Sequence, residues 1–272
     1  IVEETYEKID RTGAHAMLEV GPGRGAITSP LLKRFADSRL ERFLIVEKDE
    51  RLAEFWIEEG KRIDRPEKSV EVLSADFLKV PSEKFLARHP LVVVSNLPYS
   101  SGTAILQELA RYPVHIPAMV LMFQAEVAAR LRAQPGEKAW GSLSLWIQNR
   151  WEVRRLVAVP PSAFTPPPEV NSEVVVLEAR SSLRISPPAA PAGVDESEWR
   201  KSWDENWEKL IRIPFLHRRK MLRSGLPKNS VWKDALDAAG IEGTRRAEEL
   251  DWGDWEKWMG AVQTLTFKFK NS

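Results

Sequence analysis

The chain has 272 residues, of which 43% are apolar and 29% charged, and its formal net charge is +1. These values are typical of a globular protein and allow one large domain and one small one. The near-neutral balance excludes a chain that binds polyanions over its whole surface, so any nucleic-acid surface must be local.

The sequence contains no cysteine, which removes disulfides and thiolate chemistry and fits a reducing compartment. No apolar run reaches membrane-spanning length, and no signal peptide opens the chain. We therefore expect a cytoplasmic protein that has no membrane partner. The chain begins at Ile1 rather than Met, so we also expect that a natural N-terminal segment has been trimmed or left out.

A glycine-rich turn follows the first predicted strand. Residues 2–9 have the apolar spacing of a helix, and residues 16–20 form a short buried strand. That strand runs into Gly21-Pro22-Gly23-Arg24-Gly25, and residues 26–35 predict a helix. Together they make the first half of a βαβ unit, in which glycines let the backbone approach a ligand closely. The spacing differs from the dinucleotide fingerprint, whose third glycine would fall at Ala26.

Acidic residues end the next two predicted strands. Residues 42–46 form a strand that ends in Glu47, where a carboxylate can bind both hydroxyls of a ribose; the alternative is a solvated strand end. The third strand, residues 70–75, is followed by Asp76 and Phe77. The Asp76 carboxylate can accept from an adenine amino group, and Phe77 can lie against the ring. Alternatively, Asp76 caps the next turn.

The fourth strand, residues 91–95, ends in Asn96-Leu97-Pro98-Tyr99. Its unbroken β-branched run is typical of a central parallel strand, and Pro98 ends the ladder. An amide, two backbone carbonyls and an aromatic ring are thus presented at the carboxyl end, where open α/β sheets bind ligands. The alternative is a plain turn in which Tyr99 fills a gap.

The remaining elements of this part complete the predicted sheet. We predict a strand at residues 118–123 and helices at residues 50–59, 103–111, 124–132 and 142–148. Ser100 or Ser101 can cap the helix that starts at residue 103.

The last two predicted strands, residues 152–159 and 171–179, are joined by a proline-rich loop. Its prolines fix φ and hold one ring, Phe164, in a defined place; alternatively, the loop is a stiff connector and Phe164 belongs to the core. We expect these strands to form an antiparallel edge. The fold class is therefore α/β, with a mostly parallel seven-stranded sheet and a small all-α C-terminal domain.

Composition divides the chain into a domain at residues 1–185, a Pro/Ala linker at residues 186–194 and a helical domain at residues 195–272. Trp199, Trp203 and Trp207 recur every four residues, and we interpret them as the core of the helical domain rather than a base-stacking platform. Helices are also predicted at residues 231–239 and 255–265.

Basic residues are concentrated at residues 212–223. The segment is either a solvated face or a patch that contacts phosphates. The four histidines are scattered without metal-ligand spacing, so we expect no metal site.

Several motifs together resemble the KsgA family of small-subunit rRNA adenine dimethyltransferases. They are Leu-Glu-Val-Gly-Pro-Gly-Arg-Gly-Ala-Ile-Thr at 18–28, Val-Glu-Lys-Asp at 46–49, Ala-Asp-Phe at 75–77, Asn-Leu-Pro-Tyr at 96–99 and Val-Pro-Pro-Ser-Ala-Phe-Thr-Pro-Pro-Pro at 159–168. His-Arg-Arg-Lys-Met-Leu at 217–222 and Arg-Ala-Glu-Glu-Leu at 246–250 extend the resemblance over nearly the whole chain.

The resemblance implies a class I methyltransferase (Rossmann-like) fold that binds S-adenosylmethionine and dimethylates two adjacent adenines near the 3′ end of small-subunit rRNA. Its partner would be the small ribosomal subunit, and the enzyme would be a monomer. The cofactor residues would be Gly21, Gly23, Glu47, Lys48, Asp76, Phe77 and Asn96. The catalytic residues would be Asn96, Leu97, Pro98, Tyr99 and Phe164, and the RNA-binding residues Arg218, Arg219, Lys220 and Arg223. The family opens with a Gln-x-Phe-Leu-type segment that closes over the cofactor, and this chain starts after it.

The chemistry explains why such residues are needed. An exocyclic adenine amine is a poor nucleophile because its lone pair is delocalised into the ring. Acceptors at Asn96 and at the Leu97 or Pro98 carbonyl can localise that pair and stabilise the developing positive charge. Tyr99 and Phe164 would stack on the two faces of the base, which must leave its own stack.

Two other functions remain open. An Erm-type methyltransferase modifies one adenine of large-subunit rRNA; Leu97, the triple proline after Thr165 and the basic tail favour the small-subunit enzyme. A ribosome-assembly factor would act mainly by binding. A nicotinamide dehydrogenase is disfavoured, because no catalytic constellation accompanies the nucleotide signals.

Overall fold

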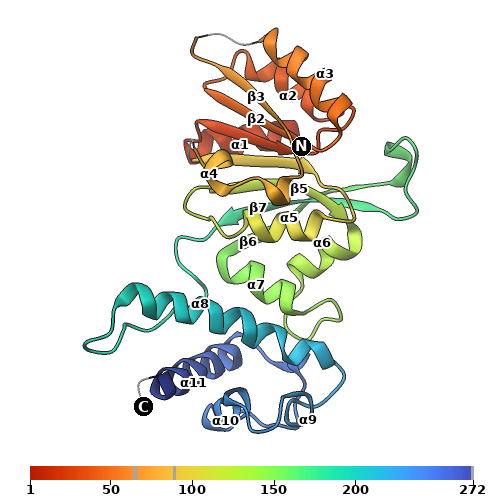
Figure 1. The fold of residues 1–272 in the computed structure, drawn as a ribbon. Coiled ribbons are helices and arrows are strands. Elements are labelled where there is room, and N and C mark those ends of the chain that lie inside the picture. The colour runs from red at the N-terminus through yellow and green to blue at the C-terminus, as the bar shows by residue number, and fades with distance from the viewer. Residues whose placement is uncertain (64–65, 88–89, 271–272) are drawn as a thin grey trace. The chain divides into compact units, whose positions relative to one another are not determined.

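A seven-stranded sheet forms the centre of the N-terminal part of the chain, in the order β3-β2-β1-β4-β5-β7-β6 (Figure 1). The structure is a computed structural model that describes residues 1–63, 66–87 and 90–270. The strands are β1 (Ala16–Val20), β2 (Arg42–Glu47), β3 (Ser69–Ser74), β4 (Leu91–Asn96), β5 (Ala118–Gln124), β6 (Trp151–Val159) and β7 (Ser172–Ala179).

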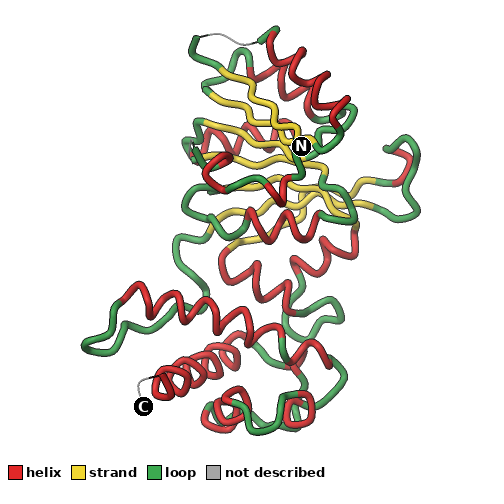
Figure 2. The backbone as a smooth tube through the Cα atoms, viewed as in Figure 1, coloured by secondary structure: helices red, strands yellow, loops and turns green. Residues whose placement is uncertain are grey.

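The first five strands are parallel, and the last two make an antiparallel edge. β7 lies between β5 and β6, so Ser172 is paired with both Gln124 and Val159. The connection between β6 and β7 therefore lies at the edge where the parallel strands end, and Figure 2 shows it projecting as a long loop. The predicted mostly parallel sheet with an antiparallel edge is confirmed.

Helices follow the strands as a βαβ pattern requires. In chain order as far as β6 they are α1 (Val2–Thr12), α2 (Thr28–Phe35), α3 (Glu50–Lys61), α4 (Ser82–Phe85), α5 (Gly102–Leu109), α6 (Ala125–Arg132) and α7 (Ser142–Arg150). Towards the C-terminus they are α8 (Glu196–Arg212), α9 (Leu222–Gly225), α10 (Val231–Ala238) and α11 (Trp252–Lys270). Short 3-10 helices include η1 (Phe77–Lys79) and η2 (Pro161–Ala163).

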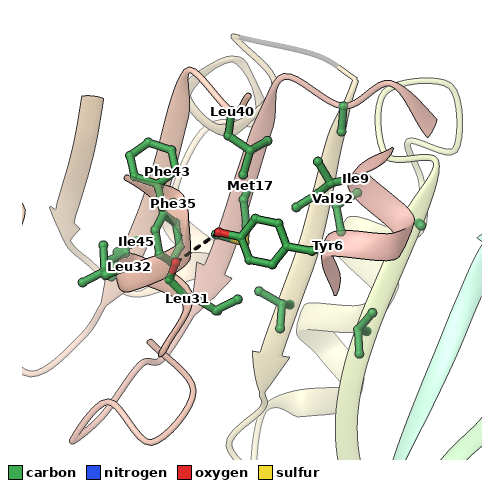
Figure 3. Packing of buried hydrophobic residues seen from close by; sticks show 14 of the residues in the cluster. Tyr6, Ile9, Met17, Leu31, Leu32, Phe35, Leu40, Phe43, Ile45 and Val92 are labelled. Carbon is green, nitrogen blue, oxygen red and sulfur yellow. Dashed lines mark hydrogen bonds between the residues drawn. The ribbon is translucent and has the colours of Figure 1, made fainter. Parts of the chain in front are cut away.

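One face of the sheet packs against apolar side chains of α1, α2 and α3 (Figure 3). Alternate residues of the strands point to this face, among them Met17, Phe43 and Val92. The Tyr6 hydroxyl, at the centre of the cluster, donates to the Leu31 carbonyl at 3.1 Å. Burial of each large apolar side chain in the cluster stabilises the fold by about 1.5–3 kcal/mol. The cluster therefore holds α2, and the glycine turn that precedes α2, against the sheet.

Local sequence signals missed some details. The helix predicted from residue 26 begins at Thr28, because Gly25 still has a left-handed φ of +84°. Ser101 is the N-cap residue of α5, but its side chain makes no capping hydrogen bond, so the predicted cap is wrong. Instead, the Gly102 amide donates to the Pro98 carbonyl at 2.7 Å. The single-turn helices α4 and α9 were not predicted, because four residues carry no periodicity.

The chain divides into two compact units, one of Ile1–Ala129 with Arg150–Ser181 and the other of Arg130–Asn149 with Ser182–Ser272. In the second unit the tryptophan stripe of α8 is buried, with exposures of 4% at Trp199, 2% at Trp203 and 0% at Trp207. The interpretation of the stripe as core is confirmed. No helix in the described part of the chain is both long and apolar enough to cross a membrane.

Candidate active site

The predicted site residues of the first unit gather at the carboxyl edge of the parallel strands. The glycine turn leaves β1 after Val20, while Glu47 and Asn96 are the last residues of β2 and β4. Asp76 lies two residues beyond the end of β3. Because these strands are parallel and adjacent, their ends must meet, which is why residues so distant in sequence share one edge.

Backbone hydrogen bonds fix the glycine turn. The Gly21 amide donates to the Val46 carbonyl at 2.8 Å, and the Gly25 amide donates to the Pro22 carbonyl at 3.0 Å. Gly23 and Gly25 have φ values of +56° and +84°, which other residues adopt only at a cost. The turn is therefore a preformed, closely approachable stretch of backbone at the sheet edge.

Glu47 binds this turn through its carboxylate. One oxygen accepts from the Gly23 amide at 3.1 Å, and the other accepts from the amides of Lys48 and Asp49 at 2.7 and 2.9 Å. The side chain is 7% exposed. A carboxylate has about four lone-pair sites, and these amides use three of them, so Oε2 keeps one acceptor site that can bind a ribose hydroxyl.

Trp56 of α3 contacts the same turn from within the core, and the sequence interpretation missed it. Its Nε1 donates to the Gly23 carbonyl at 3.0 Å. A Cβ built on Gly25 would lie 2.3 Å from the indole ring, so only glycine fits there. The sequence signal available was the apolar face of α3, which predicts burial but not the carbonyl that the indole binds.

Glu19 is a second buried acid beneath the turn and was also missed as a site residue. It is 2% exposed; one carboxylate oxygen accepts from the Thr28 hydroxyl at 3.1 Å, while Oε2 has no partner in the described part of the chain. Burial raises the pKa of Glu19 to about 8, with a smaller contribution from the nearby Glu47 charge. The side chain is therefore a neutral acid at pH 7, able to donate as well as accept.

Asp76 and Lys48 form an ion pair next to the turn, with 3.0 Å between Nζ and Oδ2. The hydrogen bond from Lys48, followed by that from the Leu78 amide, lowers the pKa of Asp76. Asp76 thus caps η1, as the alternative interpretation proposed. Phe77 is 3% exposed and packs on Phe85, with 5.2 Å between ring centroids; its contact with an adenine stays a prediction.

The Asn-Leu-Pro-Tyr segment lies directly beside the glycine turn. The Ser95 hydroxyl donates to the Val20 carbonyl, tying the end of β4 to the end of β1. A Cβ built on Gly21 would lie 3.7 Å from the Pro98 ring. Asn96 is half-buried, Leu97 is buried, and Pro98 and Tyr99 are exposed. Two motifs separated by more than seventy residues in sequence therefore form one continuous surface.

Tyr99 is held by a residue beyond the proline-rich loop. Its hydroxyl lies 2.6 Å from the hydroxyl of Ser172, the first residue of β7. The Tyr99 ring remains 40% exposed while Ser172 is 1% exposed, so the bond orients a ring whose face is open. Sequence reasoning missed Ser172, because a strand-end serine carries no local signal for a partner so far away in sequence.

Phe164 is partly buried and packs against the hydrophobic cluster on the α1–α2 side. This is closer to the alternative interpretation, a ring that belongs to the core. Its stacking on a base, opposite Tyr99, stays a prediction.

Two hollows differ in size and content. One of about 10 Å³, roughly the space of one water molecule, is lined by Leu97, Pro98, Tyr99 and residues of α5, β5 and α6. One of about 390 Å³ is lined by residues of α1 and α2 with Asp37, Ser38 and Arg39, and it contains none of the predicted site residues. The position of a base against the exposed Tyr99 stays a prediction.

The basic segment of the second unit is only partly available. Arg218 donates to Glu248 at 2.5 Å and to the Lys138 carbonyl at 2.5 Å. Its guanidinium is thus used within the unit, and the RNA-binding role of all four basic residues stays a prediction. Arg219, Lys220 and Arg223 are exposed.

Within residues 1–63, 66–87 and 90–270, no group of three or more His, Asp or Glu side chains could hold a metal ion. The edge instead offers acceptors: the Asn96 amide oxygen, the Leu97 carbonyl and the Glu47 carboxylate. The Pro98 carbonyl already accepts from the amides of Ser101 and Gly102 at 3.2 and 2.7 Å. Such a set is suited to a nucleoside on one side and an amine on the other.

Comparisons with known proteins identify the family of the chain. A family model described as ribosomal RNA adenine dimethylase matches residues 1–263. A ribosomal RNA small subunit methyltransferase A from Leptothrix cholodnii is 32% identical over 267 residues, covering 97% of this chain and 87% of that protein. A protein of the same name from Cereibacter sphaeroides is 39% identical over 241 residues, covering 86% of this chain and 77% of that protein.

The fold also matches a solved structure. A dimethyladenosine transferase from Plasmodium falciparum superposes with a TM-score of 0.69 at 22% identity, covering 99% of this chain and 96% of that chain. At this level of identity the likeness supports the fold.

Proposed function

The chain belongs to the ribosomal RNA adenine dimethylase family, and from this premise we propose that it dimethylates two adjacent adenines near the 3′ end of small-subunit rRNA. The observation that carries the proposal is the junction of the glycine turn with Asn96-Leu97-Pro98-Tyr99. Ser95 is bonded to Val20, and Gly21 lies against Pro98. A nucleoside on the turn and an amine at Asn96 would therefore be neighbours.

The residues around the turn fit S-adenosylmethionine. Glu47 Oε2 keeps an acceptor site for a ribose hydroxyl, and Gly21 and Gly23 offer backbone without a Cβ. The buried Oε2 of Glu19, unpartnered in the described residues, gives the cradle a further polar atom. Lys48, Asp76 and Phe77 are proposed for the adenine end of the nucleoside. When bound, this cofactor supplies a methyl group already activated on a sulfonium.

The acceptor side of the site acts on the adenine amine. The Asn96 carbonyl oxygen and the Leu97 carbonyl accept its two hydrogens, which localises the nitrogen lone pair and stabilises positive charge as it develops. The Pro98 carbonyl is the weaker candidate, because it already accepts from the amides of Ser101 and Gly102. A methylated amine that carries positive charge is acidic, so its proton leaves without a strong base. One hydrogen then remains on the nitrogen, which permits a second methylation.

Tyr99 supports one face of the base. Its exposed ring, oriented by Ser172, offers a stacking surface worth roughly 1–3 kcal/mol per base. Phe164 is proposed for the opposite face.

The proposed partner is the small ribosomal subunit. Arg219, Lys220 and Arg223 are exposed cations that can contact phosphates. We propose a monomer that acts in the cytoplasm, where such particles are assembled.

The test is a methylation assay with labelled cofactor on unmethylated 30S particles, followed by mapping of the labelled bases. We expect label on two adjacent adenines near the 3′ end of the small-subunit rRNA, as dimethyladenine. Label on 50S particles or 23S rRNA instead would establish the Erm-type reaction. Binding to 30S particles without label would establish an assembly factor.

A further inference from the structure

Gly23 is hydrogen-bonded on both sides of its Cα by side chains from different elements. Its N–H, in the peptide group shared with Pro22, donates to Glu47 Oε2 at 3.1 Å, and its carbonyl, in the peptide group shared with Arg24, accepts from Trp56 Nε1 at 3.0 Å. Glu47 ends β2, whereas Trp56 lies in the second turn of α3. The orientations of these two peptide groups, and so φ and ψ of Gly23, are therefore set jointly by the sheet and by a helix.

The Trp56 ring also defines the space under Gly25. A Cβ on Gly25 would lie 2.3 Å from Cη2 and 2.5 Å from Cζ2 of the indole, a separation that no stable contact reaches. Trp56 itself is 1% exposed, so the ring cannot move out of the way into solvent. The indole therefore packs directly under the turn at Gly25.

Burial alone does not explain the hydrogen bond. In the described part of the chain, the Nε1 atoms of Trp140, Trp203, Trp207, Trp252 and Trp255 are buried without partners. This protein thus tolerates unpaired indole N–H groups in its core. The Trp56 N–H, in contrast, points at one particular carbonyl, and that carbonyl belongs to the turn that faces the ligand edge.

We propose that Trp56 is a positioning residue for the nucleoside site, which it builds through Gly23 without touching the ligand. The inference rests on the proposed use of the glycine turn for S-adenosylmethionine. By fixing the Gly23–Arg24 peptide group, Trp56 restricts ψ of Gly23 and so stabilises the turn conformation in which the Gly23 N–H holds Glu47, the carboxylate proposed for the ribose. Loss of the indole N–H frees the Gly23–Arg24 peptide group to rotate, and nucleoside affinity falls.

The experiment compares Trp56→Phe with the matched control Trp151→Phe in the full chain. Trp151 is 0% exposed, and its Nε1 donates to the Ala110 carbonyl at 3.1 Å. Trp151 lies in the same unit as Trp56. It pairs with Ala179, which lies next to the amino end of β5, so Trp151 is at the sheet edge opposite to the glycine turn. Both variants lose one buried indole N–H bond to a backbone carbonyl.

The readouts are S-adenosylhomocysteine affinity by calorimetry, the melting temperature, and amide exchange of residues 21–25 in the ligand-free protein. We expect Trp56→Phe to weaken affinity about 5-fold, the usual worth of one hydrogen bond, and to speed exchange at the turn. We expect Trp151→Phe to lower the melting temperature without either effect. In turnover, Trp56→Phe should raise KM for the cofactor and leave kcat nearly unchanged.

An unchanged affinity in folded Trp56→Phe would overturn the inference, as would an equal loss in Trp151→Phe. If Trp56→Phe does not fold, Trp56→Tyr repeats the comparison with a larger ring that still lacks the indole N–H. Failure of the unaltered protein to bind S-adenosylhomocysteine would instead reject the proposed function, so the two failures are distinguishable.

Discussion

The carboxyl edge of the sheet and the basic segment at residues 212–223 are organised in opposite ways. At the edge, several polar side chains are tied to backbone: Glu47 to three amides, Trp56 to Gly23, and Ser95 to Val20. In the basic segment, Arg219, Lys220 and Arg223 are exposed. The difference fits the proposed roles, because catalysis needs fixed distances whereas phosphate binding needs only charge in the right region.

Arg218 belongs to the basic segment but, like the side chains of the edge, has fixed partners. It belongs to the basic segment by sequence, yet its guanidinium binds Glu248 and the Lys138 carbonyl. It therefore orders the segment, while its neighbours supply the charge. The contrast between a backbone-fixed edge and a solvated segment predicts mutational effects of different size.

The largest effect is expected for Asn96→Ala, which removes an acceptor from the fixed edge. We expect kcat to fall on the order of 10²–10³-fold, because one group that stabilises developing charge is lost. S-adenosylhomocysteine affinity should change little, since the glycine turn and Glu47 remain. Methylation of 30S particles and calorimetry measure the two quantities.

A matched control for that variant is Asn206→Ala. Asn206 is buried in the second unit, where it donates to Gln263 at 2.9 Å, so its loss should lower stability but leave kcat largely intact. Near-normal turnover in Asn96→Ala would remove the catalytic role assigned to this residue.

The pH dependence of stability tests whether Glu19 is protonated in its buried position beneath the glycine turn. Because its folded pKa is raised to about 8 from an ordinary value near 4, the native state holds a proton that the unfolded state has released between these pH values. Stability contributed by this group therefore falls as pH rises across that window, by at most about 1.4 kcal/mol per pH unit. Glu19→Gln should not show this slope.

Urea denaturation of both proteins at pH 5.5, 6.5 and 7.5 measures the difference. We expect Glu19→Gln to gain stability over the unaltered protein steadily with pH. A constant difference between the two proteins would mean that Glu19 is ionised in the fold throughout this range.

An intermediate effect is expected when Arg219, Lys220 and Arg223 are changed to Gln together. Each lost phosphate contact should reduce the slope of log affinity against log salt by about 0.7–0.9, so the full set reduces it by up to about 2–3. Filter binding to 30S particles over a range of salt concentrations measures the slope.

The control removes the same charge elsewhere in the second unit, through Arg200→Gln, Lys201→Gln and Lys228→Gln, all exposed residues. Equal slopes for the two triple variants would show that residues 219–223 are an ordinary solvated face. A smaller slope only for the first triple variant supports the phosphate-binding interpretation.

The smallest effect is expected for Ser172→Ala, which frees the Tyr99 hydroxyl. Loss of one hydrogen bond should reduce kcat/KM for RNA about 5-fold, with cofactor affinity unchanged. Tyr99→Phe removes the same bond from the other side. In the double variant, Ser172→Ala should add nothing to Tyr99→Phe; additive losses would show that Ser172 acts independently of Tyr99.

Much of the fold and half of the site were predictable from short-range patterns. Period-two and unbroken apolar runs located the strands, and the parallel arrangement then required Glu47 and Asn96 to meet at one edge. The four-residue spacing of Trp199, Trp203 and Trp207 likewise predicted a buried helix face.

The unpredicted contacts are long-range and involve backbone or strand ends. Trp56 binds a carbonyl 33 residues away, Tyr99 pairs with Ser172 across 73 residues, and Arg218 pairs with Glu248 across 30. No local pattern specifies such a partner, because the pairing depends on how elements pack in three dimensions. Of the residues that were missed, Glu19 was the most predictable from sequence, because an acidic residue inside a buried strand is itself unusual.

The pairing of Ser172 with both Val159 and Gln124 closes the proline-rich loop at its base. Residues added to or removed from residues 160–171 change the loop without shifting the register of the sheet below it. The hairpin can therefore vary in length while the paired strands keep their register, and exchanging this loop between relatives would test whether it selects the substrate.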